Sequence, residues 1–193
     1  MTTADRFQSA LEKLADDTAT AARRIANRRN LTKADKAVRL AGLLNRANAA
    51  AVALGDGFTA RQIEALTGTP APAAGVLPAD ESDRLLQAAQ TALEDRDSAL
   101  ERVERLARSE PVDTAQTAVT DAMNSHTPPK GQHFGWTRLL NSGACEVCVR
   151  WARNGRVWPA THWMPRHPNC ACVQQIVTTD TPPKPVTKRG TRR

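Results

Sequence analysis

The chain has 193 residues, enough for one domain of ordinary size or for a helical domain with a small added module, which excludes two full-sized domains. Hydrophobic residues make up 40% of the sequence and aromatic residues only 4%, with no tyrosine, so the composition favours helices with thin cores over a compact β-sandwich. The formal net charge of +7 favours contact with a polyanion such as nucleic acid.

The start of the sequence lacks the pattern of a secretory signal. No basic segment is followed by an apolar run there, and no stretch of the chain approaches ~18 uninterrupted apolar residues. We therefore expect a protein made in the cytosol, without a membrane partner. In that compartment four cysteines are better explained as metal ligands than as disulfides, because cytosolic thiols are kept reduced.

Residues 1–68 are predicted to form an N-terminal helical region. Apolar residues recur every three or four positions over 4–27, which is typical of an amphipathic helix. A second helix is expected to run from the capping residue Thr32 to a stop at Gly55, and a third, short helix to cover 60–66. The simplest arrangement of the first two is an antiparallel hairpin.

Much of the positive charge lies in this first region. Eight cations fall close together: Arg23, Arg24, Arg28, Arg29, Lys33, Lys36, Arg39 and Arg46. A solvated helix face explains such a group most simply.

Residues 69–78 are predicted to be a linker, and 79–125 a long helix followed by a shorter one. Prolines and a glycine in 69–78 favour an extended backbone. The long helix is expected over 80–108, with Pro111 breaking it and the shorter helix over 112–124. Its leucines repeat every seven residues, at Leu86, Leu93 and Leu100. This repeat suits packing within the chain or self-association through the 80–108 helix.

The sequence ends in a basic tail, 178–193. This segment has almost no apolar residue to bury, so we expect it to be extended or disordered. Its cations either keep the chain in solution or attract phosphate groups, and both roles stay open.

The remaining region, 126–177, holds all four cysteines, as Cys145-x2-Cys148 and Cys170-x-Cys172. A C-x2-C turn directs two thiolates toward one metal, and a second pair across a loop completes a tetrahedron. We expect one structural Zn²⁺ ion per chain in a small irregular module, because about forty residues cannot bury enough surface to fold alone. Four protein ligands would leave no position for a catalytic water.

Five residues compete for the four ligand positions: Cys145, Cys148, His167, Cys170 and Cys172. The four thiolates are slightly favoured. His167 with only one of Cys170 and Cys172 is the alternative, because a C-x-C pair is tight for two ligands of one ion. A pair of disulfides is the other interpretation of the cysteines, and His162 is a weaker candidate ligand. All four tryptophans are expected to form a small core around the site: Trp136, Trp151, Trp158 and Trp163.

Three segments of this region resemble the phage Mu F family of minor head proteins. They are 136–148, with a tryptophan before the C-x2-C turn; 152–159, with a glycine turn before Trp158 and Pro159; and the closing hexad His167-Pro-Asn-Cys-Ala-Cys172. The hexad is the most specific of the three. The chain departs from the family at 163–166, where Pro-Pro-Leu is frequent, and at Ala171, where arginine is frequent. The resemblance covers about forty residues and, more loosely, the helix expected over 112–124.

The resemblance implies a low-copy virion protein at the portal vertex or head interior, acting in head assembly, genome packaging or DNA delivery. We then expect a structural protein and not an enzyme, whose helical part docks on the portal or major capsid protein. Its zinc module and tail would face the packaged double-stranded DNA and contact it without sequence preference.

Two other function classes compete with this expectation. A zinc-ribbon-like DNA-binding regulatory protein is the main alternative, and it would need a base-reading helix beside the C-x2-C turn. An enzyme built around His162 or His167, either a zinc hydrolase or a histidine-metal nuclease, is disfavoured. A hydrolase needs a nearby carboxylate base, and the module offers only Glu146, between two thiol ligands.

Overall fold

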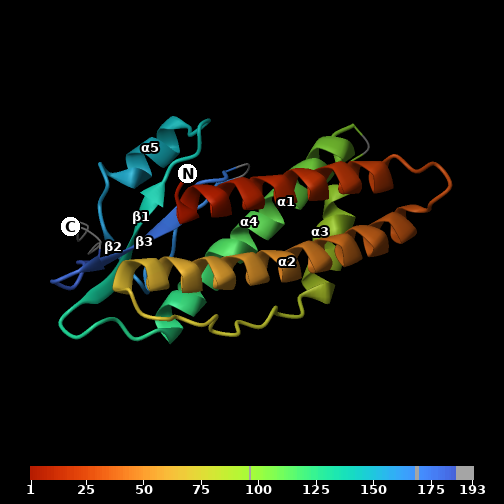
Figure 1. The fold of residues 1–193 in the computed structure, drawn as a ribbon. Coiled ribbons are helices and arrows are strands. Elements are labelled where there is room, and N and C mark those ends of the chain that lie inside the picture. The colour runs from red at the N-terminus through yellow and green to blue at the C-terminus, as the bar shows by residue number, and fades with distance from the viewer. Residues whose placement is uncertain (96, 168–169, 186–193) are drawn as a thin grey trace, which may run out of the picture.

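The chain is mainly helical, with a small sheet at one end, in the computed structural model, which describes residues 1–95, 97–167 and 170–185 (Figure 1). In chain order the elements are α1 (Thr3–Ala26), α2 (Lys33–Thr67), α3 (Ser82–Ala92), α4 (Ala99–Ser125), β1 (His133–Leu139), α5 (Glu146–Ala152), β2 (Trp158–Pro159) and β3 (Val173–Thr179). Helices α1, α2 and α4 pack against one another, and α3 packs against α2 and α4. The predicted mainly helical class is confirmed.

Local signals specify where the first two helices begin. The side chains of Thr2 and Thr32 accept hydrogen bonds from the backbone N–H groups of Asp5 and Asp35, whose carboxylates accept from the threonine N–H groups in return. Each helix therefore begins with a capping box. The expected start of a helix after Thr32 is confirmed.

Helix α2 does not stop at Gly55, so the predicted stop there and the separate helix over 60–66 are wrong. The helix continues to Thr67 and ends at Gly68, whose φ of 67° lies in the left-handed region. A Cβ at Gly55 would lie only 2.8 Å from the carbonyl oxygen of Ala115 on α4. Gly55 therefore allows two helices to approach closely. The sequence alone does not show whether a glycine has this role or ends a helix.

The helices of 79–125 are divided differently from the prediction. The expected long helix over 80–108 is wrong, because α3 ends at Ala92 and α4 begins only at Ala99. The expected break at Pro111 is also wrong, since α4 continues through it. Proline inside a helix costs about 3 kcal/mol, and here the burial of Pro111 and Val112 against the other helices offsets that cost.

The leucine repeat is not the buried stripe of this region. Leu86 and Leu93 are only partly buried at the edge of the helical core, whereas Leu85, Ala89 and Ala92 are fully buried. Packing within the chain thus uses part of the repeat, and self-association through it stays a prediction.

The linker 69–78 has neither helix nor strand and is fastened to α2 by a buried carboxylate. Asp56 accepts hydrogen bonds of 2.8 to 3.1 Å from three consecutive backbone N–H groups, at Ala74, Gly75 and Val76. These bonds satisfy the buried charge and hold the linker along the helix.

The C-terminal module is more regular than expected, because its strands form an antiparallel sheet in the order β2-β1-β3. β1 pairs with β3 from His133 opposite Thr179 to Leu139 opposite Val173. β3 therefore takes in the first two residues of the predicted tail 178–193. The rest of that prediction falls mainly on 186–193, which lie outside the described residues.

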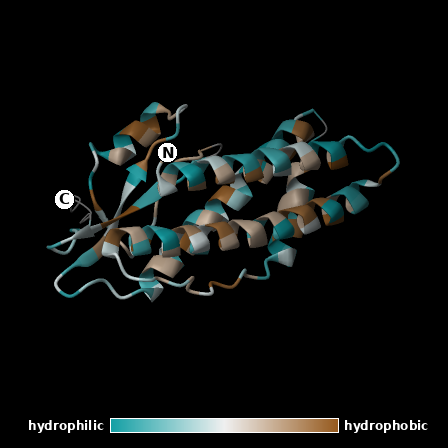
Figure 2. Cartoon of the chain, viewed as in Figure 1, coloured by the Kyte–Doolittle hydropathy of each residue, from teal (hydrophilic) through white to brown (hydrophobic). Residues whose placement is uncertain are grey.

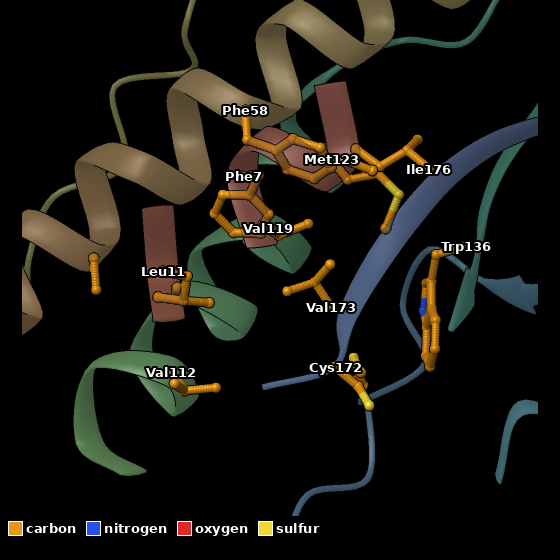
Figure 3. Close-up of a cluster of buried hydrophobic side chains, with 14 of the residues drawn as sticks. Phe7, Leu11, Phe58, Val112, Val119, Met123, Trp136, Cys172, Val173 and Ile176 are labelled. Carbon is orange, nitrogen blue, oxygen red and sulfur yellow. The ribbon is translucent and has the colours of Figure 1, made fainter. Parts of the chain in front are cut away.

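The sheet and the helices share one hydrophobic core (Figure 3). Phe7 of α1 stacks on Phe58 of α2, with ring centroids 4.2 Å apart. Trp136 of β1 and Ile176 of β3 belong to the same cluster of buried side chains. A second cluster fills the other end of the bundle, around Leu40, Leu44 and Leu85. Hydrophilic residues interrupt the helices along their length (Figure 2), and none in the described part of the chain is long and apolar enough to cross a membrane.

Candidate metal centre

The candidate ligands come from three short segments that the sheet brings together. Cys145 is the N-cap of α5 and Cys148 lies in its first turn, so the helical turn places the two side chains near each other. His167 lies in the loop after β2, and Cys170 and Cys172 directly precede β3. All four cysteines are free thiols.

The donor atoms of these residues form two overlapping groups that meet at Cys148. One group is Cys145, Cys148 and His167, and the other is Cys148, Cys170 and Cys172; the atoms within each group lie within 4.8 Å of one another. His167 Nε2 lies 3.2 Å from Cys145 Sγ and 3.1 Å from Cys148 Sγ. Cys148 Sγ lies 3.3 Å from Cys170 Sγ.

These separations suit a small tetrahedral ion. Zinc bonds of about 2.3 Å to sulfur and about 2.0 Å to nitrogen place neighbouring donors roughly 3.5 to 3.8 Å apart, so these three pairs would open slightly around an ion, while the two groups of three would draw closer together to supply four ligands. The residues present therefore fit a metal, and thiolate and imidazole donors are those that zinc prefers.

Cys172 differs from the other four candidates in its surroundings. Its side chain is completely buried, and its thiol donates to the Asn141 side-chain oxygen over 3.4 Å. Two glutamines from the helices hold its segment: Gln116 on α4 donates to the Cys172 carbonyl, and Gln8 on α1 to the Ala171 carbonyl. The C-x-C segment is thus fixed by the helical bundle as much as by the module.

A buried arginine faces the thiols. Arg138 on β1 is only 6% exposed, and its Nη1 lies 3.8 Å from Cys148 Sγ and 4.0 Å from Cys170 Sγ. Its Nη2 donates to the Pro165 carbonyl, and the guanidinium lies over the Trp151 ring at 5.3 Å from the centroid. It forms no ion pair with a carboxylate among the described residues.

Burial alone does not set the pKa values of the thiols, because the hydrogen bond between Cys170 and Cys172 raises the pKa of Cys170 and lowers that of the fully buried Cys172. Burial raises the pKa of Cys148 to about 11, and the Arg138 charge acts in the opposite direction. At the exposed Cys145, the backbone N–H of Cys148 lowers the thiol pKa. A metal bound at Cys148 would therefore replace a proton on a buried thiol.

Three of the four tryptophans pack in or beside the module's core, but the expectation that Trp163 joins them is wrong, because its side chain is 56% exposed. Trp158 stacks on His162, with ring centroids 4.3 Å apart, and Trp136 donates from its indole to the His162 carbonyl. His162 belongs to neither donor group. Burial, and secondarily the Arg156 charge, lower its pKa.

A comparison with protein-family models, curated proteins and solved structures found no match.

The chemistry of the centre therefore rests on the residues of this chain. Four residues near the candidate metal centre were not predicted from the sequence: Arg138, Asn141, Gln116 and Glu12. Glu12 lies on α1, and its pKa is raised by burial first, then by Asp16 and least by Cys172. Of these four residues, only Arg138 could have been found from the sequence. Side chains alternate between the two faces of a strand, so Arg138, two positions after the buried Trp136 on β1, lies on the same face.

Proposed function

We propose that Cys145, Cys148, His167 and Cys170 bind one structural Zn²⁺ ion, with Cys172 held beside it. His167 is supported by its contacts with two thiols, and Cys170 by its contact with Cys148. Cys172 already has a partner in Asn141. Four protein ligands close the coordination sphere, so the ion would join the α5 segment to the strand β3 and would not activate water.

The stabilising effect of such an ion would extend beyond the module. Structural zinc contributes roughly 10 kcal/mol or more to small metal-nucleated folds. Because Gln8 and Gln116 hold the C-x-C segment, and because one core joins sheet and helices, order at the metal supports the whole assembly of elements.

We further propose that the chain is a structural protein of a phage head, associated with the portal or the inner capsid. The observation that carries this proposal is the pair of overlapping Cys/His donor groups built from the hexad 167–172 and the C-x2-C turn, since these segments carry the resemblance to the Mu F family. The helices would supply the surface that docks on the portal or major capsid protein. The ion would keep the module folded through packaging and DNA delivery.

Mass spectrometry of purified phage particles tests this proposal. We expect the chain in DNA-filled heads at far fewer copies than the major capsid protein, and fewer infectious particles when its gene is deleted. Particles that lack the chain and keep full infectivity after the deletion would contradict the head-protein role. The zinc proposal is tested separately, on the purified chain.

A further inference from the structure

The end of the molecule opposite the zinc centre carries a concentrated positive charge. The end of α1, the turn after it and the first turns of α2 form this end, which projects beyond the other elements in Figure 1. Six cations lie here and are called the basic tip: Arg24, Arg28, Arg29, Lys33, Lys36 and Arg39. Figure 2 shows the turn between the helices as hydrophilic.

Among the described residues, the cations of the basic tip have no short ion pairs, although the Arg39 charge, after the hydrogen bonds from Thr32, helps to lower the pKa of the Asp35 carboxylate. Five of the six side chains are exposed and Lys36 is half-buried. None of the six forms an ion pair with a residue in the described ranges; nearby, Arg23 pairs with Glu104. Asp35, the one acidic residue between positions 23 and 39, is engaged in the capping box with Thr32.

Helix stability accounts for only part of this charge. Arg24 lies in the last turn of α1, where cations are favoured by the helix dipole. Lys33 and Lys36 lie in the first turn of α2, where the dipole is positive and cations are disfavoured. Their placement raises the local positive potential at some cost to the stability of the helix. A surface that binds an anionic partner requires such a positive potential.

We infer that the basic tip binds the phosphate backbone of double-stranded DNA, without sequence preference. This inference rests on the proposed role in a phage head, and it differs from the expectation that the zinc module faces the genome. Four arginines suit phosphate, which guanidinium binds with two parallel hydrogen bonds, and the exposed Asn27 and Asn30 add donors. A protein partner would call for an apolar centre, whereas Val38 is the one large hydrophobic side chain found exposed between positions 23 and 39.

Fluorescence anisotropy with a labelled 30-base-pair duplex of arbitrary sequence tests the inference on the full zinc-loaded chain. One variant carries Arg28→Gln, Arg29→Gln and Lys33→Gln. The matched control removes the same charge near the other end of the molecule, through Arg61→Gln, Lys130→Gln and Arg150→Gln, all at exposed positions. Zinc content and melting temperature are measured for both, to establish that each variant is folded.

The tip variant should bind DNA at least about tenfold more weakly, and its slope of log K against log salt should fall by about 2 to 3. The control variant should bind DNA with an affinity and a salt dependence close to those of the unaltered chain. Equal weakening of DNA binding in both variants would overturn the inference, because overall charge would then explain the binding. An unchanged affinity of the tip variant would overturn it as well. Polyglutamate that displaces the duplex at matched charge would indicate an acidic protein partner and overturn it too. Because none of these measurements involves capsid proteins, they can fail while the head-protein role survives.

Discussion

Cys148 is the residue on which the candidate metal centre depends most. It alone belongs to both donor groups, it is nearly completely buried, and it contacts both His167 and Cys170. Its neighbours differ in exposure: Cys145 is open to solvent, while Cys172 is enclosed. At the scale of single residues, these differences in exposure and contacts are what the proposed ligand set rests on.

Replacing His167 and Cys172 separately tests the proposed ligand set. We expect His167→Ala to weaken zinc binding by more than the roughly 10- to 100-fold seen for residues outside the coordination sphere, and Cys172→Ala to stay within that range. Competition with a chromophoric chelator measures both affinities. The opposite order would establish the four thiolates as ligands.

Arg138 is expected to stabilise the metal centre through its charge. Three thiolates and one histidine around Zn²⁺ carry a net negative charge, which the buried guanidinium opposes. We predict that Arg138→Met lowers zinc affinity about 10- to 100-fold, while Arg150→Met, at an exposed position on α5, changes it little. If both variants bind zinc as tightly as the unaltered chain, the arginine acts only by packing over Trp151.

His162 should make stability depend on pH. Its folded-state pKa is lowered, so below the ordinary value of about 6.5 the unfolded chain binds a proton more readily than the folded chain. This contribution to stability is therefore complete above that value and is lost as pH falls below it. We expect His162→Phe, which can keep the stack on Trp158, to lose less stability between pH 8 and pH 5.5 in urea unfolding. An identical loss in both proteins would contradict the prediction.

The elements are joined by close helix packing, and Gly55 lies where α2 closely approaches α4. α2 and α4 meet there without a side chain between them, with the Ala118 methyl also within reach of a Cβ at 3.1 Å. Gly57, two residues later, has only the flexible end of Arg61 near it, at 3.8 Å. The same residue type thus has opposite roles on two faces of one helix.

Alanine at these two glycines should change stability in opposite directions. Gly57→Ala should stabilise the chain by up to about 1 kcal/mol, because alanine is the better helix former. Gly55→Ala gains the same propensity but must separate two backbones, and we expect a net loss of about 1 to 3 kcal/mol. Chemical denaturation followed by circular dichroism compares the two, and a stabilised Gly55→Ala protein would exclude the close contact.

At the scale of the whole molecule, metal removal should reach the helices. The C-x-C segment is held by α1 and α4, and one core spans the sheet and the bundle. We predict that chelation lowers the melting temperature seen by helical circular dichroism and by tryptophan fluorescence together, by more than about 10 °C. Helices that melt at an unchanged temperature would establish the module as a separate folding unit.

Features that depend on residues close together in the chain could be predicted from the sequence alone. Capping at Thr32 depends on side chains three residues apart, and ligand chemistry on the spacing of Cys145 and Cys148, so both features could be predicted. The mainly helical class followed from apolar periodicity for the same reason.

Packing between distant segments decided the rest. From local preference alone, Gly55 is predicted to stop a helix and Pro111 to break one. Both helices continue because α4 packs against α2, and burial there outweighs local preference. Arg138 has no visible link to Cys170 in the sequence, and only pairing of β1 with β3 brings them together. The sequence by itself determined which chemistry the cysteines and His167 offer, and the tertiary structure decided which side chains surround them, since contacts across the fold depend on packing that no local pattern encodes.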